Sequence, residues 1–133
     1  MADVTIAAIE EMEPIYDGVM RRARATLGVT AWGMQVLTLP ANWEGYPAHN
    51  HDAKAQDPNQ EEVYVPLAGS AVLEADGQTF DLRPGMMARV GPRQYRRILP
   101  GPDGIRFIAL GGVPGSFTPS AWSELGAPPP VAG

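Results

Sequence analysis

The sequence predicts an all-β fold, a small barrel or sandwich of about eight to ten short strands. Its 133 residues include 15 glycines and 14 prolines, about twice the ordinary share, spread between short apolar segments. Turn pairs such as Asp76-Gly77 and Gly91-Pro92 separate those segments. This spacing favours many strands joined by tight turns over a disordered chain. One domain of this length can bury a core, and there is no cysteine to form a disulfide or a thiolate site.

In the N-terminal half, the expected elements end where turn residues interrupt the apolar segments. Pro14 ends a short helix or strand, Gly28 closes a strand whose arginines form one solvated face, and Pro40 stops the next strand. The elements expected here are a short helix or strand over 5–13, and strands over 19–27, 31–39 and 48–51.

The C-terminal half begins with a polar loop over 52–60 and continues as strands with turns between them. Asp76-Gly77 suits a type I′ turn, so the clearest hairpin is expected there. The expected strands are 62–67, broken at Gly69, and then 71–75, 78–82, 86–90, 95–99 and 105–110, with a turn over 100–104. From Gly111 onward, a Pro-rich tail is expected to wrap the surface or fray.

The two histidines of the chain, His49 and His51, form the main candidate for a functional site. Residues two apart on a strand point to the same face, so both imidazoles would point the same way. A carboxylate from a neighbouring strand would complete a site of two histidines and one carboxylate, as used by non-haem iron and related metals. The alternative for such a pair taken alone is two exposed histidines in a loop.

The residues around these histidines resemble the first motif of the cupin superfamily. In that motif a glutamate follows the histidine pair, and six residues then lead to a glycine; Glu62 and Gly69 have this spacing. The second cupin motif places a glycine, a proline, a glycine, a histidine and an asparagine at fixed intervals. At those positions this chain has Gly85, Gly91, Arg93, Arg96 and Pro100. The resemblance covers roughly residues 20–115, and it is closest to small bacterial single-domain cupins (RmlC-like β-barrels) without an assigned reaction.

The resemblance implies a cupin-type double-stranded β-helix, a jelly-roll barrel, with a short N-terminal and a Pro-rich C-terminal extension. The expected organisation is an N-terminal extension over 1–18, the barrel over 19–113 and the tail over 114–133. A homodimer is also implied, and the apolar segments near both ends would suit an intersubunit sheet. The implied metal ligands are His49, His51 and Glu62, holding a divalent ion (iron, manganese, nickel or zinc).

The chain departs from the cupin pattern at three places. Residues 52–61 separate the histidine pair from Glu62, where the family has three or four residues; this loop is either a lid over the barrel mouth or a plain insertion. Trp43 replaces the glycine that precedes the first histidine, although Gly45 lies close. Arg96 replaces the third histidine, and a guanidinium has no lone pair to offer a metal.

Three interpretations of Arg96 are open. In the first, His49, His51 and Glu62 alone hold the metal, and Arg96 pairs with a bound carboxylate. In the second, the metal site is weak or lost, and Arg96 grips a small anion in the barrel. In the third, Arg96 forms a salt bridge with Glu62 in a structural cavity. Residues proposed to take part beside it are Tyr64 in catalysis, with Arg96, and Arg97 and Gln94 in substrate binding.

The leading functional hypothesis is a metal-dependent cupin enzyme acting on a small, carboxylate-bearing substrate, as an oxygenase, isomerase, decarboxylase or lyase. The alternative is a non-catalytic cupin that binds a small anion. A net charge of −5 argues against a nucleic-acid partner. The chain start has no basic, apolar leader and no apolar run of about 18 residues occurs, so we expect neither a signal peptide nor a membrane span, and a cytoplasmic location.

Overall fold

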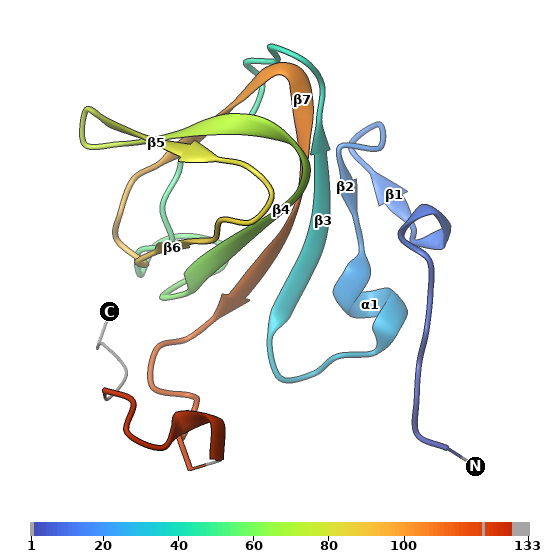
Figure 1. Cartoon of the computed structure of the whole chain (residues 1–133), viewed down its shortest axis with the longest axis vertical. Helices are drawn as coiled ribbons and strands as arrows, with labels where there is room; N and C mark the ends of the chain where they lie inside the picture. The colour runs from blue at the N-terminus through green and yellow to red at the C-terminus, as the bar shows by residue number, and fades with distance from the viewer. Residues whose placement is uncertain (1, 121, 129–133) are drawn as a thin grey trace.

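The computed structural model describes residues 2–120 and 122–128, and in this part of the chain the fold is all-β, as predicted. Its strands form one antiparallel sheet in the order β1-β2-β3-β7-β4-β5, with β6 also paired to β4 (Figure 1). The strands are β1 (Pro14–Ile15), β2 (Met20–Arg21), β3 (Gly33–Leu39), β4 (Glu61–Ala75), β5 (Gln78–Leu82), β6 (Ala88–Val90) and β7 (Arg97–Gly112). The helices are the 3-10 helices η1 (Ile9–Glu11) and η2 (Trp122–Glu124) and the α-helix α1 (Ala23–Leu27).

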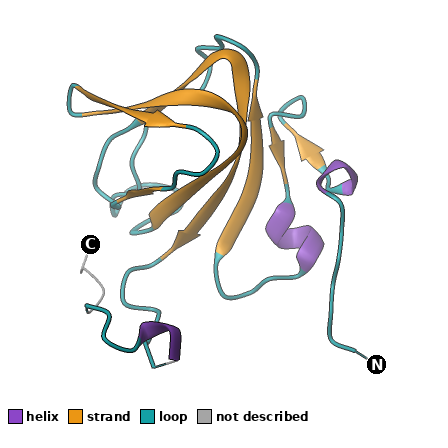
Figure 2. Ribbon diagram, in the orientation of Figure 1, coloured by secondary structure: helices purple, strands orange, loops and turns teal. Residues whose placement is uncertain are grey.

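Two long strands, β4 and β7, pair with each other along most of their length and bend the sheet into a barrel (Figure 2). On its other edge β4 carries β6 at its N-terminal end and β5 at its C-terminal end. The C-terminal half of β7 pairs with β3. Glu62 therefore lies where β4 runs between β6 and β7, at one end of the barrel.

The breaks expected at Gly69 and over 100–104 do not separate strands. Both segments remain inside strands β4 and β7, although residues 101–104 have no partner on β4; register shifts occur at the steps from Pro66 to Ala68 and from Gly69 to Ala71. Gly69 and Gly104 have φ angles of +74° and +70°. Glycine adopts this left-handed backbone without steric cost, so the strands bend sharply here, as at a β-bulge, without ending.

Substituting Gly69 by alanine should lower the free energy of unfolding by about 3 kcal/mol or more. Its new Cβ would fall on the carbonyl oxygen of Gly104, in addition to the strain of a positive φ. Gly77→Ala is the matched control, because Gly77 also has a φ of +74° but has no atom within 4 Å of the added Cβ. Chemical denaturation should show a loss of about 1 kcal/mol in the control; equal losses in both variants would contradict the close contact.

The hairpin predicted at Asp76-Gly77 is confirmed. Residues Ala71 to Ala75 of β4 pair with Leu82 to Gln78 of β5. Asp76 and Gly77 have φ angles of +51° and +74°, and positive φ at both central positions is the mark of a type I′ turn.

The strand expected over 19–27 is wrong in its second half. Only Met20 and Arg21 form a strand, and Ala23–Leu27 form α1. Alanine, arginine and leucine favour a helix, and Gly28 ends it in the left-handed conformation with φ +77°. Ala23 packs with Met12 and Val36 in a small apolar cluster separate from the main core.

The main core consists of side chains from the barrel strands together with Tyr46. Its members include Leu37 and Leu39 of β3, Tyr64 and Leu73 of β4, Leu82 of β5, Val90 of β6, and Ile98, Ile105 and Phe107 of β7. Beyond β7, the described tail contains η2 and exposes Phe117, Trp122 and Leu125. The predicted Pro-rich end at 129–133 lies outside the described residues. Among the described helices, none has the length and apolar character to span a membrane.

Candidate metal centre

The histidine pair lies beside Arg96 in a single antiparallel bridge, not in the strand expected over 48–51. The His49 N–H donates to the Arg96 carbonyl at 3.0 Å, and the Arg96 N–H donates to the His49 carbonyl at 2.9 Å. The His51 N–H donates to the Pro92 carbonyl at 2.7 Å. These bonds hold the segment extended, and the two rings lie edge to face with centroids 5.1 Å apart. The expectation that both imidazoles share a face therefore agrees with this geometry.

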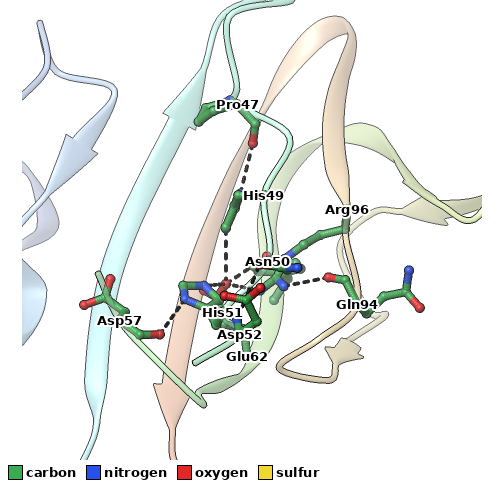
Figure 3. A network of polar contacts seen from close by, with 10 residues as sticks. Pro47, His49, Asn50, His51, Asp52, Asp57, Glu62, Gln94 and Arg96 are labelled. Carbon is green, nitrogen blue, oxygen red and sulfur yellow. Dashed lines mark hydrogen bonds and ion pairs between the residues drawn. The ribbon is translucent and has the colours of Figure 1, made fainter. Parts of the chain in front are cut away.

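Glu62, the second residue of β4, brings its carboxylate to both histidines (Figure 3). One ligand atom from each of His49, His51 and Glu62 lies within 4.8 Å of the others. The Oε1 atom of Glu62 is 2.6 Å from Nε2 of His51 and 3.7 Å from Nε2 of His49. The three predicted ligands thus form one cluster that could hold a metal ion.

Backbone carbonyls orient both imidazole rings. Nδ1 of His49 lies 3.0 Å from the Pro47 carbonyl oxygen, and Nδ1 of His51 lies 2.9 Å from that of Asp57. A carbonyl oxygen only accepts, so Nδ1 carries the proton in each ring, and in the neutral ring the lone pair is on Nε2. Both Nε2 atoms face Glu62. This tautomer is the one in which metal-ligating histidines are held by surrounding hydrogen bonds.

Arg96 is fully buried and uses all three of its side-chain nitrogens inside the protein. Nη2 donates to Oε1 of Glu62, Nε donates to the Tyr64 hydroxyl at 3.1 Å, and Nη1 donates to the Gln94 carbonyl at 2.9 Å. Of the three interpretations, the structure displays the Arg96–Glu62 salt bridge directly. Contact of Arg96 with a substrate carboxylate stays a prediction.

Glu62 is held in its ionised form. Burial alone would raise its pKa, but the polar neighbours His49, Arg96 and His51 outweigh burial and lower the pKa to about 2. The carboxylate is therefore negative at neutral pH, as a metal ligand must be.

Tyr64 connects the carboxylate to the guanidinium. Its hydroxyl donates to Oε1 of Glu62 at 3.2 Å and accepts from Nε of Arg96, and its ring packs edge-on against Phe107. Burial, together with the negative charge of Glu62, raises its pKa to about 12, against the lowering effect of Arg96. At neutral pH, the hydroxyl is thus a proton donor.

Gln94 and Arg97, the other two predicted substrate contacts, turn away from the cluster. The Gln94 side-chain amide donates to the Tyr95 carbonyl at 2.9 Å, and only its backbone carbonyl contacts Arg96 (Figure 3). Arg97 donates to the Glu44 carbonyl at 3.0 Å. Neither side chain is brought to the three ligands, and their contact with a substrate stays a prediction.

The loop over 52–60 folds back onto His51. The Asn59 N–H donates to the His51 carbonyl at 2.7 Å, while the Asp57 carbonyl accepts from the His51 ring. The sequence contains no signal for the contacts made by Asp57 and Pro47, because they are made by backbone atoms.

The sequence analysis also missed Tyr46, which is buried with its ring centroid 5.7 Å from that of His49. The available signal was its position three residues before His49.

Alkaline pH should destabilise the barrel through its two buried tyrosines. Burial raises the pKa of Tyr46 far above its ordinary value of 10, and that of Tyr64 to about 12. Because the folded pKa values are raised, the unfolded chain ionises first, so stability is intact below pH 10 and falls as pH rises through 12. Tyrosinate absorbance should therefore stay incomplete at pH 11 until the protein unfolds. Full ionisation of all 4 tyrosines with the barrel still folded would contradict this.

Solved structures of other proteins share this architecture. A cupin protein from Bacteroides fragilis superposes with a TM-score of 0.69 at 21% identity, covering 91% of this chain and 93% of its own. A cupin 2 conserved barrel domain protein from Salinispora arenicola gives 0.60 at 13% identity, covering 84% and 88%. A cupin-superfamily sugar phosphate isomerase from Silicibacter pomeroyi gives 0.59 at 18% identity, covering 75% and 59%.

No protein-family profile and no curated protein matches the sequence. At the identities above, structural likeness speaks for the fold and not for an activity. The fold predicted from the two motifs is confirmed by the barrel and by its structural neighbours. This protein is a small chain with the cupin fold.

Proposed function

We propose that the protein is a metal-dependent enzyme acting on a small, carboxylate-bearing substrate, with His49, His51 and Glu62 as the metal ligands. One observation carries the proposal: two Nε2 lone pairs face one ionised carboxylate, and Nε2 of His51 is only 2.6 Å from Oε1 of Glu62. At 2.6 Å these two atoms share a proton, as in a short hydrogen bond; a metal ion, with ligand distances of about 2.0–2.2 Å, would replace that proton as the two atoms move apart. A divalent cation satisfies all three groups together.

The donor set fits such an ion. Two imidazoles and one carboxylate with open positions suit iron, manganese, nickel or zinc. A bound divalent ion supplies a Lewis acid or a site for oxygen activation. The imidazole of His49 is the most exposed of the three groups, at 30% against 11% for His51 and 14% for Glu62. Substrate access is therefore assigned to the side of His49.

The surrounding residues position the carboxylate and provide a proton. Arg96 and Tyr64 both donate to Oε1 of Glu62, which restricts the rotation of this side chain. The Tyr64 hydroxyl, neutral at pH 7, is the proposed proton donor to substrate. The positive charge of Arg96 favours a negatively charged substrate. The fold hosts more than one kind of reaction, and this site suits oxygenase, isomerase, decarboxylase or lyase chemistry.

The proposed assembly is a homodimer. Large apolar side chains are exposed near both ends of the described chain, where an intersubunit sheet is expected: Val4 (70%), Ile6 (89%) and Phe117 (60%). Size-exclusion chromatography with light scattering would distinguish a dimer from a monomer.

The second candidate is a non-catalytic protein that binds a small anion. It is favoured by the Arg96–Glu62 salt bridge, which neutralises the carboxylate from within the protein. In this case the cation required beside Glu62 is Arg96 itself, with a proton shared between His51 and the carboxylate.

Metal content distinguishes the two candidates. Untagged protein, purified without chelator, is analysed by elemental mass spectrometry and then titrated with iron(II), manganese(II), nickel(II) and zinc(II). We expect about one equivalent of metal per chain, as a single two-histidine, one-carboxylate site would take up. If the protein binds none of the four ions, with or without a small carboxylate present, the metal-dependent function is wrong and the anion-binding function is favoured.

A further inference from the structure

Oxygen Oε1 of Glu62 lies at the centre of four polar side chains, those of His51, Tyr64, Arg96 and His49. His51 Nε2 lies 2.6 Å away, the Tyr64 hydroxyl 3.2 Å and His49 Nε2 3.7 Å, and Arg96 Nη2 is in direct contact. A metal ion bound to this oxygen would therefore be a close neighbour of a guanidinium that is charged at every accessible pH. The protein places a permanent positive charge beside the metal position.

The Arg96 side chain cannot move away from Glu62 without breaking its other contacts. Its side chain is 0% exposed, and its three nitrogens are held by Glu62, Tyr64 and the Gln94 carbonyl. The neighbouring pair of Arg89 and Glu61 does not compensate it, because these two charges neutralise each other at 2.7 Å and are partly exposed. The charge of the cluster is thus set by its own members.

The −1 of Glu62 is already offset by the +1 of Arg96 before a metal ion binds. Tyr46 and Tyr64 add nothing when neutral, and the histidines add nothing or, with a proton shared between His51 and Glu62, a further positive charge. A divalent ion would bring the net charge to about +2 in a largely buried site, which is costly. An anionic ligand on an open coordination position reduces this excess.

We propose, on the basis of the function proposed above, that Arg96 makes metal binding and anion binding at this site mutually dependent. The metal ion alone and the carboxylate alone bind weakly, and together they bind tightly. Coupling of binding free energies is reciprocal, so the carboxylate increases affinity for the metal by the same factor by which the metal increases affinity for the carboxylate. The ligand class is a small carboxylate whose negative charge, rather than its shape, is required.

Wild-type protein tests the coupling directly. Zinc(II) affinity is measured with a competing dye in three solutions: without additive, with acetate, and with acetamide, the neutral isostere of acetate. The values are corrected for zinc–acetate complexes in solution. We expect acetate to tighten zinc binding by about tenfold or more, zinc to tighten acetate binding by the same factor, and acetamide to have no effect. Equal zinc affinity in all three solutions would overturn the coupling and leave the metal site intact; no zinc binding in any of them would overturn the metal site itself.

Two variants assign the coupling to Arg96. Arg96→Met removes the charge and keeps most of the side-chain length, so zinc binding without acetate should tighten by about tenfold and the effect of acetate should fall toward none. Arg89→Met is the matched control, because it removes the same charge from the partly exposed pair with Glu61 and should keep the coupling. Unchanged coupling in Arg96→Met would overturn the role of Arg96. If that variant does not fold, the reciprocal measurements on the wild-type protein still decide whether metal and carboxylate are coupled.

Discussion

Arg96→Gln is expected to lower the free energy of unfolding by about 3–5 kcal/mol, measured by urea denaturation in the presence of a chelator. Arg96 is buried, and Glu62 is only 14% exposed on its side chain. Removing the guanidinium leaves a largely buried carboxylate without its cation and takes a hydrogen-bond donor from the Tyr64 hydroxyl and from the Gln94 carbonyl. Breaking one side of such a pair costs far more than the intact pair contributes.

The control for this loss is Arg89→Gln on β6. Arg89 pairs with Glu61, the residue before Glu62, at 2.7 Å, but its side chain is 45% exposed. Exposed pairs contribute only about 0.2–1 kcal/mol, so the control should lose no more than that. A loss for Arg96→Gln as small as for the control would show that water replaces the guanidinium and that the cluster is less closed than its exposure indicates.

His51→Ala is expected to weaken divalent metal binding by more than about 100-fold while the barrel still folds. His51 is the histidine closest to Glu62, and its ring is held from the other side by the Asp57 carbonyl. The barrel core is built from other residues, so circular dichroism should be unchanged. The readout is metal stoichiometry after dialysis and the dissociation constant from titration.

Asn50→Ala is the control for the histidine variant. Asn50 lies between the two histidines, and its side-chain oxygen accepts only a long hydrogen bond, 3.4 Å, from the Asp52 N–H. Metal binding should be retained in this variant. If His51→Ala also keeps its full metal content, the ligand assignment is wrong.

The turns of this fold can be predicted from the sequence more reliably than the lengths of its strands. The Asp76-Gly77 hairpin is decided by two adjacent residues that accept a positive φ, so it can be predicted from the sequence. The continuity of β7 through 100–104 depends on the pairing of Pro100 and Ile105 with β4, contacts distant in sequence, and Pro and Gly in this segment are typical of turns. The short helix at Ala23–Leu27 was missed because Arg22 and Arg24, two residues apart, also fit one face of a strand.

The candidate ligands could be predicted, whereas the state of Arg96 could not. The spacing of His49, His51 and Glu62 follows a motif, and the structure brings these three side chains together. Whether Arg96 faces a substrate or Glu62 depends on how one long side chain packs in the barrel. Sequence spacing leaves that choice open, and the geometry places Arg96 on Glu62.

The backbone support of the two imidazoles has a consequence for how this site tolerates change. The groups that fix the rings are the carbonyls of Pro47 and Asp57, which are present whatever side chains occupy those positions. Substitutions along 52–60 that keep the path of the loop would therefore leave the tautomer of His51 unchanged. Shortening this loop by one residue would move the Asp57 carbonyl and release the ring. The orientation of His51 thus depends on the length and path of the loop more than on its individual side chains. A scan of single substitutions would not detect this dependence.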